Sequence, residues 1–191
     1  MVDRSDSRFQ RPIRDQRLLD ALERLRQHPY SGSVWRSIRE GRDPLACWRS
    51  GGRWDDGSFD VLYTSETREA ALAERRFHLF QGQPFPPSKV RYELYELRVS
   101  LEAAITFGTV DELAAVGLDI SHYGQLSYPE REREYPRSQE IAEACFFLGS
   151  DGIIVPSARS PNAANVIIFC EQSTTLEKEV VRNHGVVDLR D

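Results

Sequence analysis

The sequence has few cysteines and no long apolar segment. Its 191 residues include only three cysteines, Cys47, Cys145 and Cys170, and their wide, irregular spacing matches neither a disulfide framework nor a zinc-binding pattern. We therefore expect all three to be reduced and buried. No apolar run approaches the ~20 residues that span a bilayer, and the first residues are too charged for a signal peptide. These absences predict a cytoplasmic protein without a membrane contact.

Positive charge is not in excess either. The formal net charge is −5 at pH 7, whereas nucleic-acid binding is dominated by clustered lysine and arginine. We therefore predict no direct nucleic-acid binding. Arginine greatly outnumbers lysine, and guanidinium groups suit bidentate contacts to phosphate, so a local basic cleft is compatible with this composition.

Common catalytic signatures are also absent. The sequence contains no Walker loop, GxGxxG, HExxH, CxxC pair or GxSxG elbow, which removes the commonest phosphate-binding, zinc and acyl-transfer signatures. We predict no metal site. The chain length and the 40% apolar content are sufficient for one domain with its own buried core.

The apolar patterning predicts an α+β order of elements. Leucines spaced by three and four predict a helix over 15–27, after a polar segment, 1–14, that we expect to be a mobile arm. Thr67 has the chemistry of a helix N-cap, and so does Ser138. The remaining predictions are a helix from Thr67 towards Gly82, a helical turn over 111–116, a surface loop over 121–137, a helix over 139–149, and strands over 34–38, 59–65, 89–100, 151–157 and 165–170.

The stretch 51–65, GGRWDDGSFDVLYTS, carries the most informative arginine. Arg53 follows two glycines that let the backbone approach a ligand, and its guanidinium suits a diphosphate or a carboxylate. The alternative is an ion pair with Asp55 or Asp56, which we expect to be turn residues rather than catalysts.

Five more polar candidates lie at the ends of apolar elements or in the helix after one. These candidates are Arg36, Tyr63, Glu74, Ser157 and Asn165. Each has an ordinary structural alternative. Arg36 can be an ion-paired arginine, Tyr63 a ring of the core and Glu74 a solvated carboxylate on its helix, whereas Ser157 and Asn165 can be the hydroxyl and the amide of turns.

Taken in order along the chain, these pieces resemble the RES domain family, whose members include toxins of bacterial toxin–antitoxin pairs. The resemblance covers about residues 31–170 and divides the chain into an N-terminal arm and amphipathic helix, 1–30, a RES domain, 31–175, and a C-terminal tail, 176–191. The matching segments are VWR at 34–36, GGRW at 51–54, VLYTS at 61–65, ALAE at 71–74, DGIIVPSAR from 151 and NVIIF from 165.

The resemblance implies a compact mixed-sheet core similar to the ADP-ribosyltransferase fold, with an added N-terminal helix. It also implies a site for NAD+ as substrate, in which Arg53, Glu74 and Ser157 are catalytic. The family often has asparagine where Asp55 stands, so no contact from that position is inferred. The residues implied to contact NAD+ are Arg36, Arg53, Trp54, Tyr63, Ser157 and Asn165.

The function implied first is an NAD+-degrading toxin, a glycohydrolase or phosphorylase that cleaves the nicotinamide–ribose bond. Such cleavage passes through an oxocarbenium-like state, for which Glu74 is the stabilising carboxylate and Arg53 the diphosphate clamp. The partner implied is a cognate helix-turn-helix, Xre-like antitoxin. The protein itself is expected to form a homo-oligomer or to be part of a toxin–antitoxin assembly. The alternatives are a protein ADP-ribosyltransferase that uses the same site, and a non-catalytic nucleotide- or partner-binding domain.

Overall fold

The computed structural model describes residues 14–80, 90–125, 130–172 and 177–189, with the backbone alone at 131–134. The arm predicted for 1–14 lies outside this range apart from Arg14, as does the predicted helix end near Gly82. No helix in the described part of the chain is long and apolar enough to cross a membrane.

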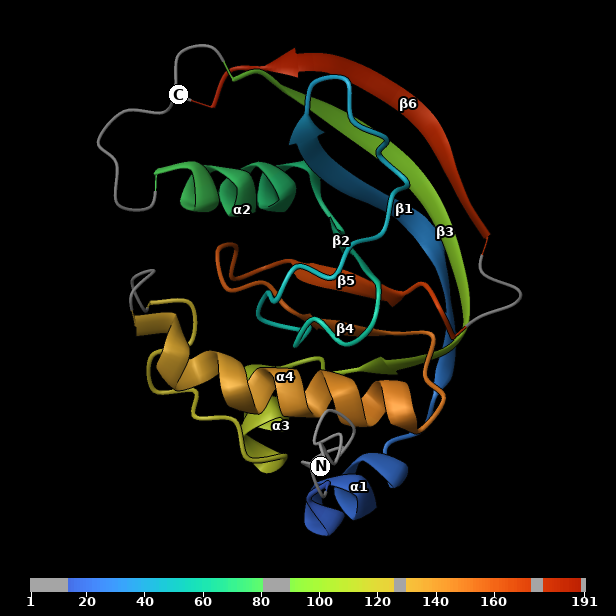
Figure 1. Ribbon diagram of the computed structural model, residues 1–191, viewed down its shortest axis with the longest axis vertical. Coiled ribbons are helices and arrows are strands. Elements are labelled where there is room, and N and C mark those ends of the chain that lie inside the picture. Colours follow the sequence, from blue (N-terminus) through green and yellow to red (C-terminus); the bar gives the residue numbers. More distant parts are fainter. Residues whose placement is uncertain (1–13, 81–89, 126–129, 173–176, 190–191) are drawn as a thin grey trace, which may run out of the picture.

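A mixed six-stranded sheet forms the centre of the fold (Figure 1). Its order is β1-β2-β5-β4-β3-β6, and β1 pairs along its length with β3 as well, so the sheet closes on itself with β6 outside β3. Only the β3–β4 pairing is parallel among the described strands. The bounds are β1 His28–Arg39, β2 Val61–Ser65, β3 Tyr92–Thr106, β4 Gly152–Pro156, β5 Ala164–Phe169 and β6 Glu177–Val187.

The helices lie on two sides of this sheet, which confirms the predicted α+β class. In Figure 1, α1, α3 and α4 gather at one end, and α2 lies apart from them across β2, β4 and β5. A buried cluster that includes Leu22, Leu113 and Ile141 packs the first group onto β4 and β5. Ala71 and Leu72 of α2 pack near Leu94 of β3. The helices are α1 Gln16–Glu23, α2 Arg68–Phe80, α3 Val110–Ala115 and α4 Arg131–Phe147.

Several local predictions are confirmed. The backbone N–H of Ala70 donates to Thr67 Oγ1 at 3.2 Å, so Thr67 caps the start of α2 as expected. The buried, apolar runs of β4 and β5 form adjacent antiparallel strands. Strong capping chemistry and continuous apolar runs were sufficient to locate these elements.

The prediction of a loop over 121–137 is wrong in its second half, because α4 begins at Arg131 and contains Pro136. Pro136 is the sixth residue of α4, beyond the first turn where proline is best tolerated, so the helix forms there although Pro136 has no N–H to donate to the carbonyl four residues earlier. Ser138 is consequently not an N-cap. It is buried within α4, and its Oγ donates to the carbonyl of Tyr135 at 3.1 Å.

β1 begins earlier than predicted. The strand predicted over 34–38 starts at His28 instead, and Gly32 within it pairs with Val99 of β3. Pro29 lies at the second position of β1, a location near a strand end that proline tolerates. Pairing with the long neighbouring strand therefore overrides the weak local signal.

The last segment is also more ordered than a tail. Of residues 176–191, Glu177–Val187 form β6 and pair with β3. The division of the chain at residues 30 and 175 stays a prediction, but β6 is part of the central sheet.

The expectation of three reduced cysteines is wrong, because Cys47 and Cys170 form a disulfide. The bridge joins the connection between β1 and β2 to the residue after β5, across a sequence separation of 123. Cys145 of α4 is buried and has a free thiol. The fold brings together two residues whose spacing in sequence carries no recognisable disulfide signal.

Reduction of Cys47–Cys170 is expected to lower the free energy of unfolding by about 2–4 kcal/mol, because a crosslink over a long loop restricts the unfolded chain. Urea unfolding with and without dithiothreitol measures this difference. The double variant Cys47→Ser, Cys170→Ser serves as the control and should not respond to the reductant. An unchanged midpoint for the reduced wild-type protein would contradict the expectation.

Candidate functional site

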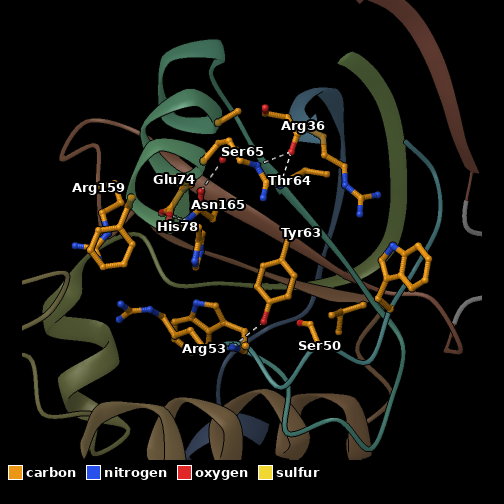
Figure 2. A pocket seen from close by; sticks show the side chains of 18 of the residues that line it. Arg36, Ser50, Arg53, Tyr63, Thr64, Ser65, Glu74, His78, Arg159 and Asn165 are labelled. Atoms are coloured by element: carbon orange, nitrogen blue, oxygen red, sulfur yellow. Dashed lines mark hydrogen bonds between the residues drawn. The ribbon is translucent and has the colours of Figure 1, made fainter. Parts of the chain in front are cut away.

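A cavity of about 490 Å³ lies between α2, β2 and the turn that carries Arg53 (Figure 2). Tyr135 of α4 and Asn165 of β5 complete parts of its wall. The cavity therefore draws on segments from more than half of the chain. Of the predicted residues, those on its wall are Arg36, Arg53, Trp54, Tyr63, Glu74 and Asn165.

Glu74 is held by two donors on one of its oxygens. Glu74 Oε1 accepts hydrogen bonds from Asn165 Nδ2 at 2.8 Å and from Ser157 Oγ at 3.2 Å. Asn165 is oriented in turn by Ser65, whose Oγ donates to Asn165 Oδ1 at 2.8 Å. No described residue donates a hydrogen bond to Glu74 Oε2, so this oxygen can contact a ligand in the cavity.

Ser157 contributes to the site through Glu74 rather than as part of the cavity wall. It is buried, and its Oγ also accepts the backbone N–H groups of Arg159 and Ser160 at 3.2 and 3.1 Å. These contacts fix the hydroxyl behind the carboxylate. In this geometry Ser157 positions Glu74.

The turn before Arg53 is organised by the buried carboxylate of Asp55. Asp55 accepts the N–H groups of Gly51 and Gly52 at 2.6 and 3.0 Å, and the hydroxyls of Ser50 and Tyr63 at 2.7 and 2.8 Å. Asp55 is thus a turn residue as predicted, and Asp56 accepts hydrogen bonds from Ser58 nearby. Both carboxylates accept hydrogen bonds from their own turn.

The hydroxyl of Tyr63 joins this turn to β2. It accepts the backbone N–H of Trp54 at 2.9 Å while it donates to Asp55. A side chain at Gly52 would have its Cβ 2.7 Å from this hydroxyl, so the close approach requires glycine. Burial, followed by the Asp55 charge, raises the pKa of Tyr63 well above its ordinary value. Tyr63 is therefore a neutral hydrogen-bonding group, and its ring forms part of the cavity wall.

Arg53 projects from this turn towards two aromatic rings. Its guanidinium carbon lies 5.0 Å from the centre of the Tyr123 ring and 5.5 Å from that of Tyr135. Gln139 of α4 supports the same turn, because its Nε2 donates to the carbonyls of Gly52 and Asp55 at 2.7 and 3.0 Å. The backbone that carries Arg53 is thus fixed from both β2 and α4.

Arg36 lines the cavity, but one nitrogen of its guanidinium already donates hydrogen bonds to the protein backbone. Its Nη1 donates to the carbonyls of Pro44 and Ala46 at 2.6 and 2.9 Å. Burial, and secondly the charge of Arg75, lowers the pKa of Arg36 to about 10. Arg36 thus holds the connection between β1 and β2, and fewer of its N–H groups are left to bind a ligand. Trp54 is 2% exposed and packs into the core beside the cavity.

The cavity wall carries four arginines and a single carboxylate. Arg36, Arg53, Arg75 and Arg159 line the cavity, and Glu74 is the only acidic side chain on the wall formed by the described residues. Three of these arginines, Arg36, Arg75 and Arg159, also donate to backbone carbonyls. Such a distribution attracts an anionic ligand and leaves one position suited to a cationic group. Within the described ranges, no group of three or more histidine, cysteine or acidic residues is arranged to hold a metal ion.

Several cavity residues were not recognised as candidates from the sequence. Arg159 lies in the segment quoted for the family resemblance, and it packs over the Phe77 ring and donates to the carbonyl of Gly124. Ser65 follows Tyr63 by two positions, a spacing that places both on one face of a strand. His78 shares a helical face with Glu74, as their separation of four residues predicts, and it lines the cavity although a lone histidine at such a position is more often structural. The roles assigned to all site residues stay predictions.

Comparisons with known proteins agree with this architecture. No curated protein matches the chain. The fold is similar to that of a chain in the crystal structure of the M. tuberculosis MbcT–MbcA toxin–antitoxin complex, with a TM-score of 0.73 and 20% sequence identity over 90% of this chain and 92% of that chain. A family model described as the RES domain matches residues 21–189, from α1 through β6. The chain therefore belongs to the RES domain family.

Proposed function

We propose that this protein binds NAD+ and cleaves its nicotinamide–ribose bond. The observation that carries the proposal is the anchored Glu74 carboxylate within an arginine-lined cavity. Cleavage of this bond develops positive charge on the ribose, and a nearby carboxylate stabilises that charge. Because Asn165 and Ser157 hold Oε1, the Oε2 atom of Glu74 keeps a defined position towards the sugar.

The diphosphate of NAD+ is the natural partner of the arginines. A guanidinium can donate two parallel hydrogen bonds to phosphate oxygens, and the fixed turn beneath Arg53 reduces the conformational entropy lost on binding. Arg36 has a smaller part in this role because its Nη1 already binds two carbonyls. The ring of Tyr63 borders the ligand, while its hydroxyl maintains the turn.

The proposed biological role is that of a toxin neutralised by a cognate antitoxin. The similar fold in the MbcT–MbcA toxin–antitoxin complex and the membership in the RES domain family support it. We propose a helix-turn-helix, Xre-like antitoxin as the partner and the cytoplasm as the compartment. Because disulfides are rare in a reducing cytoplasm, the formation of the Cys47–Cys170 disulfide is the structural feature that depends most on the compartment.

Product analysis of the purified, antitoxin-free protein with NAD+ tests the reaction. Incubation with and without phosphate, followed by chromatography, separates free ADP-ribose from its phosphorylated form. Release of nicotinamide with either product supports hydrolysis or phosphorolysis, whereas ADP-ribose attached to protein indicates a transferase that uses the same site. The absence of nicotinamide release would refute both enzymatic functions and favour a non-catalytic nucleotide- or partner-binding domain.

Replacement Glu74→Gln is expected to lower kcat by about 100-fold to 1,000-fold, because it removes the charge that stabilises the transition state. The glutamine carbonyl can still accept the hydrogen bonds of Asn165 and Ser157, so the affinity for ADP-ribose should change little. Steady-state kinetics and calorimetry measure the two quantities. Equal kcat values for the variant and the wild-type protein would contradict the assigned role.

Replacement Arg53→Ala is expected to weaken ADP-ribose binding by about 10-fold to 100-fold and to lower turnover as well, because charge-assisted hydrogen bonds to the diphosphate are lost. Arg53→Lys keeps the charge without the bidentate geometry, so its affinity for ADP-ribose should lie between those of Arg53→Ala and the wild-type protein. Calorimetric titration with ADP-ribose measures the series. A binding constant that is the same in all three proteins would exclude contact with the diphosphate.

Replacement Tyr63→Phe is expected to lower the free energy of unfolding by about 1–3 kcal/mol, because the buried Asp55 and the N–H of Trp54 each lose a partner. The looser turn should also raise KM for NAD+. Urea unfolding and steady-state kinetics are the measurements. Trp35→Phe is the control, because it changes another ring on the cavity wall and leaves the turn intact. It separates the loss of the Tyr63 hydroxyl from a change in the shape of the wall. Equal effects of Tyr63→Phe and Trp35→Phe would contradict this reasoning.

A further inference from the structure

Trp48 is an exposed aromatic residue on the wall of the cavity. Its surface is 48% accessible, and it lies in the connection between β1 and β2. Large aromatic side chains are usually well buried, and an exposed one at a binding cavity often marks a contact surface. Its neighbour Trp54, on the same wall, is by contrast 2% exposed.

The exposure of Trp48 does not result from a loosely held backbone. Its N–H donates to the carbonyl of Val61 at 3.0 Å, and its carbonyl accepts the N–H of Val61 at 3.2 Å. Cys47 on one side is bound to Cys170. Arg49 on the other side forms ion pairs with Asp60 and Glu171 at 3.2 and 2.7 Å. A fixed backbone therefore presents a half-exposed indole to the cavity.

β2 relates Trp48 to the rest of the site. Val61, Tyr63 and Ser65 alternate onto one face of β2, and all three line the cavity. Trp48 pairs with Val61 at the start of this row, and Ser65 at its end binds Asn165, which binds Glu74. Four steps along a strand span about 13 Å. Figure 2 shows Ser50, from the same connection as Trp48, and Glu74 on opposite sides of Tyr63.

The turn of Arg53 is fixed near the middle of this row, because Tyr63 binds Asp55 and the N–H of Trp54. The exposed indole therefore lies at one end of this row and the anchored carboxylate at the other, while the Arg53 side chain extends from the turn towards the side of Tyr63 on which Glu74 lies (Figure 2). A dinucleotide also has two separated ends, a planar base at one and a ribose that bears the second ring at the other. With the reacting ribose at Glu74, the base at the far end of the ligand lies towards Trp48.

We propose that Trp48 is the stacking platform for the adenine ring of the dinucleotide and thereby contributes to the affinity for NAD+. The proposal deepens the proposed function and rests on it for the orientation of the ligand. Stacking of a base on an aromatic side chain is a large, sequence-tolerant contribution to binding. The backbone pairing of Trp48 with Val61 holds this platform beside β2.

The test compares wild-type protein with Trp48→Ala and Trp48→Phe by calorimetric titration with ADP-ribose and by KM for NAD+. Trp48→Ala should weaken ADP-ribose binding by about 10-fold to 100-fold and raise KM by a similar factor, whereas Trp48→Phe should retain most of the affinity. Phe147→Ala, which removes an aromatic ring that is 50% exposed outside this cavity, is the matched control and should bind as the wild-type protein does.

Tryptophan fluorescence adds a direct signature of stacking. ADP-ribose should quench part of the wild-type emission, and Trp48→Phe should lack that part. Unaltered affinity in Trp48→Ala and unaltered quenching in Trp48→Phe, with NAD+ cleavage intact, would overturn the platform and leave the proposed function standing. Trp48-dependent binding without nicotinamide release would support the platform and refute the cleavage. Absence of both binding and cleavage in the wild-type protein would overturn the two together.

Discussion

The buried carboxylate of Asp55 is the interaction on which the geometry of the site depends. A carboxylate removed from water is costly unless it is fully hydrogen-bonded, and Asp55 meets this requirement with donors from Ser50, Gly51, Gly52 and Tyr63. Those donors belong to a turn and to a strand of the central sheet. The need to satisfy one charge therefore couples the position of the turn to the sheet.

The closed sheet supplies the second constraint. β2 pairs with β5 so that Ser65 lies opposite Asn165, and the same two side chains form a hydrogen bond. Asn165 then donates to Glu74 of α2, which joins a helix to the interior of the sheet by a polar contact. A change in the β2–β5 register would separate all three groups. The carboxylate is thus placed by strand pairing rather than by its own helix alone.

The parts of the fold predicted from the sequence are those with local signals. The apolar runs of β4 and β5 and the cap at Thr67 can be recognised from a few neighbouring residues. The bounds of β1 and β6, by contrast, depend on pairing with β3. The site divides in the same way. Arg53 and Glu74 stand out by residue type and order, but the pairing of Cys47 with Cys170 and the exposure of Trp48 exist only after distant segments have packed together.

The charge of the cavity near neutral pH follows from its arginines and from Glu74. His78 also lines the wall, but loss of hydration lowers its pKa, and Arg75, Arg159 and Arg53 act in the same direction against the opposing attraction of Glu74. A pKa below the ordinary value keeps the imidazole neutral at pH 7. His78 therefore adds no positive charge beside the carboxylate. In the proposed cleavage, Glu74 then acts on the developing cation while arginines of the wall hold the anionic part of the ligand.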